Sequence, residues 1–326
     1  SSCVRLNAGT PQGSIISPLL FIIYLADIDR WLSKGSAFSY ADDTAAITCG
    51  DTKELALQRL EHTSTELLRF FASNCLVANS SKTSLLVFRS QRSSDTRVYS
   101  VKVGDASITA SNNITLLGVK LSADLTWSDQ FDAITSSLRS TNGLICRLSK
   151  FMPNKYLTPL IHGLHLSKLR YALPVFCNVR TSESDPVSSN MSHIQVELNK
   201  GLRMVLGITQ VDRQPVHELI AAVGVPTANQ VAAETTLMDT WRHLTYSLPA
   251  AKHLKPIEEY VSENRTTRRT GKGFLAVPFQ RSESGETRFI QQGARIWNDA
   301  PQEIRMETDE AKAKRLIHEY CKTLPL

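Results

Sequence analysis

Two adjacent carboxylates, Asp42 and Asp43, are the residues of this 326-residue chain with the clearest potential for chemistry. Apolar and β-branched residues flank them, over 38–40 and 44–48, and this pattern predicts two strands joined by a tight acidic turn. Carboxylates held together on a turn repel each other unless a cation lies between them. Oxygen ligands of this kind suit Mg²⁺, which binds through one or two carboxylates plus substrate phosphates. Because Asp is also a favoured turn residue, a solvated turn without chemistry is the alternative.

A glycine-bearing loop and an apolar segment come before this hairpin. Residues 7–14 read Asn-Ala-Gly-Thr-Pro-Gln-Gly-Ser, and residues 15–32 are predicted to form an apolar helix. We expect Ser17 to cap this helix and Pro18 to occupy its first position. A broad apolar face predicts burial against a sheet for Leu19, Leu20, Ile22, Ile23 and Leu25. A glycine-bearing loop ahead of a helix allows the backbone to approach a nucleotide or a strand of nucleic acid.

The order and spacing of these two segments resemble the core of a reverse transcriptase, and the closest resemblance is to non-LTR (LINE-type) retrotransposons. Pro11, Gln12 and Gly13 match motif B of that family, which lines the incoming nucleotide and the template. Residues 40–43, Tyr-Ala-Asp-Asp, match motif C, the metal-binding hairpin. The resemblance implies that Asp42 and Asp43 are catalytic metal ligands, that Tyr40 lies beside the nucleotide and template, and that two Mg²⁺ ions act in the intact enzyme.

Two later segments match further motifs of the same family. Residues 79–83 read Asn-Ser-Ser-Lys-Thr, so Lys82 matches a lysine that acts near the triphosphate. A surface lysine at the start of a strand explains Lys82 almost equally well. Residues 114–121 are predicted to form a strand interrupted by Gly118, either as a bulge or as a close backbone approach. By resemblance, Leu117 and Gly118 belong to the primer grip.

The whole pattern predicts an α+β fold, in which a partial polymerase palm (an antiparallel sheet with packed helices) is followed by a helical thumb and a mostly helical C-terminal region. The predicted boundaries are 1–113 for the palm, 114–127 for the primer-grip-like segment, 128–225 for the thumb and 226–326 for the C-terminal region. A helix is also predicted from about residue 53 to 74. The later helices are expected over 128–150, 155–172, 192–206, 221–249 and 311–320. Helical spacing predicts buried positions at Phe131, Ile134, Leu138, Ile145, Val231, Leu237 and Trp241.

Positive charge is concentrated after the acidic hairpin. Residues 81–180 carry 13 basic and five acidic residues, whereas residues 1–80 carry six basic and eight acidic ones. Nucleic-acid binding requires such charge to displace the counterions of the phosphates, although a basic solvated face is the alternative. By resemblance to a polymerase thumb, the residues expected to face the template–primer duplex are Arg139, Arg147, Lys150, Lys155, Lys168 and Arg170.

Composition limits the cellular setting. The six cysteines include no Cys-x-x-Cys pair, which argues against a zinc knuckle and a disulfide scaffold and favours a reducing, intracellular compartment, cytoplasmic or nuclear. The longest apolar run, over 15–26, is too short to span a bilayer, so no membrane partner is expected.

The resemblance implies an RNA-directed DNA polymerase that uses an RNA template, a DNA primer and deoxynucleoside triphosphates. In that family the fingers and motif A, which carries another metal-binding aspartate, precede motif B. We therefore expect the chain to lack the N-terminal part of a parent polyprotein and to be inactive alone. The alternative is a non-catalytic nucleic-acid-binding remnant of such an element. Residues 295–301, which include Trp297, Asn298 and Pro301, resemble a Trp-Asn-x-x-Pro segment of LINE-type reading frames to which the sequence assigns no chemistry.

Overall fold

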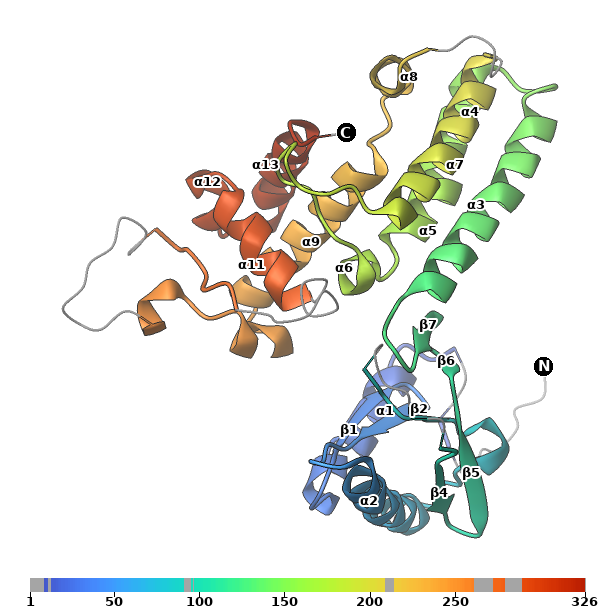
Figure 1. Ribbon diagram of the computed structural model, residues 1–326, viewed down its shortest axis with the longest axis vertical. Helices are drawn as coiled ribbons and strands as arrows, with labels where there is room; N and C mark the ends of the chain where they lie inside the picture. Colours follow the sequence, from blue (N-terminus) through green and yellow to red (C-terminus); the bar gives the residue numbers. More distant parts are fainter. Residues whose placement is uncertain are drawn as a thin grey trace. The chain divides into compact units, whose positions relative to one another are not determined.

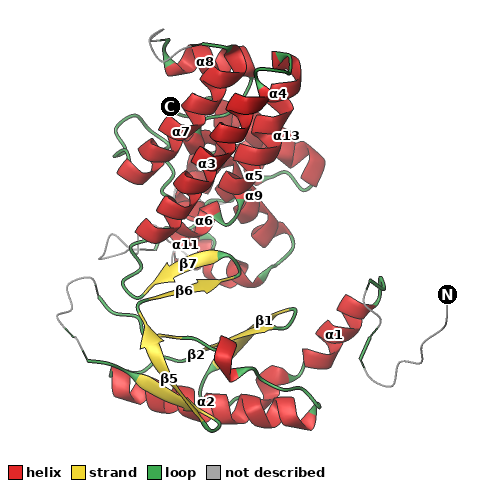
Figure 2. Cartoon of the chain, turned by 90° about the vertical axis from the view of Figure 1, so that its right-hand side faces the viewer, coloured by secondary structure: helices red, strands yellow, loops and turns green. Residues whose placement is uncertain are grey.

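The computed structural model describes residues 9–10, 13–90, 95, 97–208, 214–260, 272–278 and 289–325. The chain divides into two compact units, Ser1–Leu125 and Thr126–Leu326, which we call the N-terminal unit and the helical unit. The strands among the described residues belong to the N-terminal unit, apart from one isolated bridge between Pro256 and Leu275 (Figures 1 and 2). The predicted α+β class, with strands early and helices late, is confirmed.

The N-terminal unit combines one long helix with short helices and small sheets. Its elements are α1 (Ser17–Leu25), the 3₁₀ helix η1 (Ile28–Trp31), β1 (Ser36–Tyr40), β2 (Asp43–Ile47), α2 (Lys53–Ser73), the 3₁₀ helix η2 (Ser80–Lys82), β3 (Leu85–Leu86), β4 (Ser100–Val103), β5 (Ala106–Ser111), β6 (Asn113–Leu116) and β7 (Val119–Ser122). The pairs β1–β2 and β6–β7 are antiparallel hairpins, and a third sheet has the order β3-β5-β4 with β3 parallel to β5.

Helix α2 supplies much of the core of the N-terminal unit. Thr52 caps it, because its hydroxyl oxygen accepts the backbone N–H of Leu55 at 3.2 Å. The buried core consists of Leu25, Ile28, Leu67 and Phe70, against which Ala37 and Ala46 of the β1–β2 hairpin pack. The hairpin is therefore held by its small residues on one face of a small core.

The predicted burial of the first apolar helix is wrong for all but one residue. Leu25 is buried, whereas Leu19, Leu20, Ile22 and Ile23 are between 48% and 64% exposed. The helix is also shorter than predicted, and Ile16 rather than Ser17 is its capping residue. The reason lies in the residues themselves. They are apolar around the whole circumference of α1 instead of along one stripe, so contact on one side cannot cover them all.

The helical unit consists of helices packed around one continuous core. Its elements are α3 (Ser128–Leu148), α4 (Asn154–Leu160), the π-helix η3 (Ile161–Leu166), α5 (Ser167–Arg170), α6 (Leu173–Phe176), α7 (Ser189–Leu206), α8 (Val216–Val223), α9 (Ala228–Thr245), the 3₁₀ helices η4 (Pro249–His253) and η5 (Ile257–Tyr260), α11 (Phe289–Asp299), α12 (Gln302–Arg305) and α13 (Glu310–Lys322). Helix α9 contacts both α11 and α13, and α3 lies along α7 (Figure 1).

The periodicity of the sequence identified this core correctly. The predicted positions Phe131, Ile134, Leu138 and Ile145 are buried on α3, and Val231, Leu237 and Trp241 are fully buried on α9. Residues of both the predicted thumb and the predicted C-terminal region belong to the same buried cluster. The structure divides the chain into two compact units, whereas the sequence predicts four segments. The boundaries of these four segments stay a prediction.

The Trp-Asn-x-x-Pro segment has a structural role in the helical unit. The indole N–H of Trp297 donates to the carbonyl of Gly273 at 2.7 Å, and the side-chain amide of Asn298 pairs with both backbone groups of Leu275 at 2.8 Å. Arg305 donates to the carbonyl of Lys272 at 3.0 Å and lies over the ring of Phe274. Together these side chains fix residues 272–278 against α11 and α12.

Among the helices of the described residues, none combines the length and the apolar character that are needed to cross a membrane.

Candidate active site and nucleic-acid-binding residues

The tip of the β1–β2 hairpin presents the two carboxylates. The strands pair from Ser36 opposite Ile47 to Tyr40 opposite Asp43, which leaves Ala41 and Asp42 as a two-residue turn. Ala41 adopts a left-handed backbone with φ of 52°, as a turn this tight requires. Asp42 occupies the turn itself and Asp43 begins β2, and both side chains are exposed. The structure therefore places the two predicted metal ligands next to each other at the end of a hydrogen-bonded hairpin.

The two faces of this hairpin differ because successive side chains of a strand point to opposite sides. Ala37 and Ala46, which lie opposite each other, face the core of the N-terminal unit. The other face carries Phe38 and Tyr40, which are 61% and 70% exposed, together with Asp43 opposite Tyr40. An exposed aromatic ring thus lies across the strands from a carboxylate, an arrangement in which a base or sugar can contact the ring.

The donor set at the tip fits a hard divalent cation. Two exposed carboxylates offer oxygen ligands and leave coordination positions for water and phosphate, which is the usual environment of Mg²⁺. Within the described residues, no group of three or more His, Cys, Asp or Glu side chains lies close enough to hold a metal. Asp42 and Asp43 stay the predicted metal ligands, as a pair of carboxylates without a third ligand among the described residues.

The predicted motif B loop lies only partly within the described residues. Pro11 and Gln12 lie outside them. Gly13 has φ of +84° and Gly9 has φ of +82°, a backbone conformation that side chains other than glycine rarely adopt. This part of the loop ends directly before α1.

Lys82 lies in a short turn and is exposed. Asn79 fixes the turn, because its side-chain oxygen accepts the N–H of Ser81 at 3.1 Å and its carbonyl accepts the hydroxyl of Thr83 at 3.0 Å. Among the described residues no hydrogen bond or ion pair joins Lys82 to Asp42 or Asp43. The turn therefore leaves the ammonium group available to solvent or to a ligand.

Leu117 and Gly118 form the two-residue turn between β6 and β7. Leu116 pairs with Val119, and the two turn residues have φ of 47° and 78°. The strand that the sequence predicts as interrupted is thus a tight hairpin, in which Gly118 is the residue suited to the positive φ. Leu117 is 42% exposed, so the turn presents an apolar side chain at the surface.

Three of the six predicted nucleic-acid-binding residues are engaged within the helical unit. Arg139 donates to Glu197 at 2.9 Å. The ammonium of Lys168 donates to the hydroxyl of Thr141 at 2.7 Å and to a backbone carbonyl of α3. Arg170 lies 3.6 Å from a carboxylate oxygen of Glu234. These contacts join helices to one another. They engage three of the basic side chains that the sequence predicts to contact nucleic acid.

The other three, Arg147, Lys150 and Lys155, are exposed around the turn that joins α3 to α4. Among the described residues none of them forms an ion pair, and Lys155 lies over the ring of Tyr156 at 4.9 Å. The three of the six predicted residues that form no ion pair among the described residues therefore lie around one turn of the chain.

A buried polar cluster between α3, α7 and η3 was not predicted from the sequence. Glu197 is 3% exposed and accepts hydrogen bonds from Arg139 and from Lys200, each at 2.9 Å. Although burial raises the pKa of Glu197, these two partners outweigh it and hold the pKa below its usual value. Asn142 donates to the carbonyl of Glu197 at 3.0 Å, so the cluster joins two long helices.

His165 completes this cluster from the π-helix. Its Nε2 lies 2.8 Å from the side-chain oxygen of Asn142, whose amide nitrogen donates to Glu197, so His165 is the donor of this bond. Its other ring nitrogen is buried without a hydrogen-bond partner among the described residues. No spacing rule could have found this cluster, since Glu197 lies 55 residues from Asn142 and 58 from Arg139.

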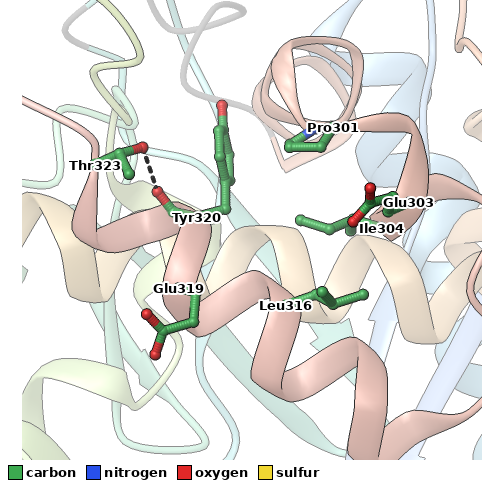
Figure 3. Close-up of a pocket in the computed structure, with 7 residues that line it drawn as sticks. All are labelled: Pro301, Glu303, Ile304, Leu316, Glu319, Tyr320 and Thr323. Atoms are coloured by element: carbon green, nitrogen blue, oxygen red, sulfur yellow. Dashed lines mark hydrogen bonds between the residues drawn. The ribbon is translucent and has the colours of Figure 1, made fainter.

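A pocket of about 380 Å³ lies at α12 and α13. Its lining consists of Pro301, Glu303, Ile304, Leu316, Glu319, Tyr320 and Thr323 (Figure 3). Burial raises the pKa of the Tyr320 phenol to about 12, so this side chain is neutral at physiological pH. None of the predicted site residues lines the pocket.

Comparison with known proteins relates the N-terminal unit to one family. Residues 4–121 match the family model described as reverse transcriptase (RNA-dependent DNA polymerase). This segment contains the glycine loop, the Asp42–Asp43 hairpin, Lys82 and the Leu117–Gly118 turn, and it lies entirely within the N-terminal unit. Searches of curated proteins and of solved structures found no match. The N-terminal unit is therefore similar to part of a reverse transcriptase domain.

Proposed function

We propose that this chain is part of the RNA-directed DNA polymerase of a non-LTR (LINE-type) retrotransposon. The observation that carries the proposal is the position of Asp42 and Asp43 at an exposed hairpin tip, inside the segment that matches the reverse transcriptase family. In this role, the N-terminal unit contributes metal ligands and nucleotide contacts, and the helical unit contributes contacts to nucleic acid.

The residues of the N-terminal unit have distinct tasks in this proposal. Asp42 and Asp43 hold divalent cations, and Mg²⁺ bound there activates the primer hydroxyl and stabilises the leaving oxygen. Tyr40 offers its exposed ring to the nucleotide or template beside Asp43. The Pro11–Gly13 loop positions the template and the incoming nucleotide. Lys82 contributes a positive charge near the triphosphate, and the Leu117–Gly118 turn contacts the primer backbone.

Two aspartates carry two negative charges, whereas two Mg²⁺ ions carry four positive ones. The polymerase role therefore requires a further carboxylate, and the described residues contain no group of three metal-ligating side chains. For this reason, the test uses two proteins. One is this chain, and the other is this chain extended at its N-terminus by a strand that carries one further aspartate.

Primer extension on an RNA template with Mg²⁺ tests the proposal. In the protein that is active, Asp42→Asn should lower extension on the order of 100-fold or more, because it removes charge that stabilises the transition state, while duplex binding is retained. Asp105→Asn is the matched control, since Asp105 is another exposed aspartate in a hairpin turn of the same unit. Substantial synthesis by the Asp42→Asn protein, or no synthesis by either parent protein, would refute the polymerase role.

A second candidate function is nucleic-acid binding without catalysis. Arg147, Lys150 and Lys155 favour it, because they are exposed and form no ion pair among the described residues, whether or not a metal binds at the hairpin. Binding of this kind weakens steeply with salt and is independent of Mg²⁺. Filter-binding measurements with and without EDTA, from low to moderate salt, distinguish it from a metal-dependent interaction.

A further inference from the structure

The turn between α3 and α4 combines exposed positive charge with an exposed aromatic ring. Arg147 and Lys150 precede Phe151, and Lys155 and Tyr156 follow it at the start of α4. Phe151 is 85% exposed and Tyr156 is 53% exposed. Cations and accessible rings thus alternate over ten residues of the chain surface.

The structure holds Phe151 outward in a defined backbone position. Its N–H donates to the carbonyl of Leu148 at 2.9 Å, and the N–H of Met152 donates to the same carbonyl at 2.9 Å. Met152 packs against the core of the helical unit, whereas its neighbour Phe151 does not. The turn is therefore anchored by Met152 and keeps an apolar ring in water.

Helix stability explains the charge of Arg147 at this turn but not that of Lys155. Arg147 lies in the last turn of α3, where a cation is favoured by the helix dipole. Lys155, however, lies in the first turn of α4, where the same dipole disfavours a cation. Among the described residues, no carboxylate pairs with any of the three, and residues 133–182 contain no Asp or Glu at all.

We infer that the α3–α4 turn is a binding site for unpaired nucleotides of a nucleic acid. Phe151 stacks against a base, while Arg147, Lys150 and Lys155 contact the flanking phosphates, since positive grooves with aromatic rings are the means by which proteins bind single strands. The inference sharpens the nucleic-acid-binding role proposed above, and it does not depend on polymerisation because it rests on the helical unit alone.

Fluorescence anisotropy of the full chain tests this site, with a labelled 20-nucleotide single strand, the corresponding duplex and anionic vesicles as separate ligands. Phe151→Ala should weaken binding of the single strand about five- to 100-fold, the range for loss of one stacked base, and should leave duplex binding nearly unchanged. Val187→Ala is the matched control, because Val187 is an apolar residue of the same unit that is 59% exposed. Phe151→Trp should retain binding, and fluorescence of the new indole should be quenched on binding the oligonucleotide.

The charges are tested by the triple substitution Arg147→Gln, Lys150→Gln and Lys155→Gln. Because each phosphate contact to a single strand contributes about 0.7 to the slope of log affinity against log salt, the slope should fall by about 2. Substitution of Lys252, Lys314 and Arg315 by Gln removes the same charge from other exposed positions of the helical unit and should change the slope little.

Five outcomes would overturn the inference. Phe151→Ala could bind the single strand as the parent does, or it could lose affinity equally for the duplex, and either result excludes stacking. The two triple variants could weaken binding equally, which would show a diffuse charge effect. Binding to vesicles alone would identify a membrane surface instead. A chain that fails to bind any nucleic acid would also refute the binding function, whereas failure of primer extension alone would leave this site unaffected.

Discussion

The protonation state of His165 in the helical unit is set by its surroundings and not by its residue type. His165 is fully buried, donates to Asn142 and has no partner for its second ring nitrogen among the described residues. Burial, together with the nearby ammonium of Lys168, lowers the pKa of His165 to about 4. The ring is therefore neutral in the folded protein at physiological pH, even though the cluster to which it belongs also contains the charged residues Glu197, Arg139 and Lys200.

This pKa predicts a loss of stability at mildly acidic pH. An unfolded histidine has a pKa of about 6.5, so between pH 6.5 and 4 the unfolded chain binds a proton that the folded chain does not. The stabilisation from neutral His165 is complete above pH 6.5 and is lost progressively as the pH falls toward 4. Between pH 7 and 5, the free energy of unfolding should decrease by about 2 kcal/mol through this residue.

Urea titrations at pH 7 and pH 5 measure this difference. His165→Gln removes the titrating group, so its free energy of unfolding should depend less on pH, even if the variant is less stable throughout. His162→Gln is the matched control, because His162 lies one helical turn earlier and is exposed. An equal pH dependence in the parent and the His165→Gln protein would contradict the assignment.

The sequence predicted the position of a residue correctly where the signals that determine it lie close together in the chain. Asp42 and Asp43 lie at a hairpin tip because the strand and turn signals lie within ten residues of one another. Arg139 and Lys168 could not be placed in the same way. Their partners Glu197 and Thr141 are 58 and 27 residues away, so whether they face solvent or another helix is decided by packing.

At the level of elements, the contact between α3, α7 and η3 depends on one glycine. A Cβ atom on Gly201 would lie 2.9 Å from the side-chain oxygen of Asn142, 3.1 Å from Nε2 of His165 and 3.2 Å from Cδ1 of Ile161. The polar cluster and the close approach of the helices therefore require the absence of a side chain at this position.

Gly201→Ala should consequently destabilise the protein by roughly 1–3 kcal/mol, the usual cost of overpacking, although alanine is the better helix former. Gly143→Ala provides the control. A Cβ at Gly143 of α3 meets nothing within 4 Å, so this change should stabilise the protein by roughly 0.5–1 kcal/mol. Chemical denaturation of both variants measures the contrast, and a stabilising effect of Gly201→Ala would show that the helices separate easily.

Helices were easier to predict than their surroundings. In the amphipathic helices α3 and α9, the spacing of apolar residues indicates which face is buried, and these predictions are confirmed at Leu138 and Trp241. The sequence of helix α1 does not indicate a buried face, because its apolar residues lie on all sides of the helix. The hydrogen bonds of Trp297 and Asn298 could not be predicted from the sequence, because their partners lie 24 and 23 residues earlier in an irregular segment.

For the molecule as a whole, the two units differ in the size of their cores. The buried hydrophobic cluster of the N-terminal unit has four residues, whereas that of the helical unit extends over helices α3 to α13. Because buried apolar area is the main stabilising contribution, the N-terminal unit should unfold at a lower urea concentration than the helical unit.

Tryptophan fluorescence and circular dichroism can follow the two units separately. Trp31 lies in the N-terminal unit and packs edge-on against the buried ring of Phe70, whereas Trp127, Trp241 and Trp297 lie in the helical unit. Trp31→Phe should remove the fluorescence change of the early transition and leave the later one in place. A single transition with the same midpoint for both signals would contradict independent unfolding.

The position of α13 also has a consequence for biosynthesis. Ile317 of α13 is fully buried, and Asn229 and Gln230 at the start of α9 donate to the backbone carbonyls of Pro325 and Lys322. Helix α13, which begins at Glu310, thus closes a core whose first helix begins at Ser128. At about 5–20 residues per second, the earlier helices wait roughly 10–40 s with apolar faces uncovered, so a nascent helical unit is a natural client for chaperones.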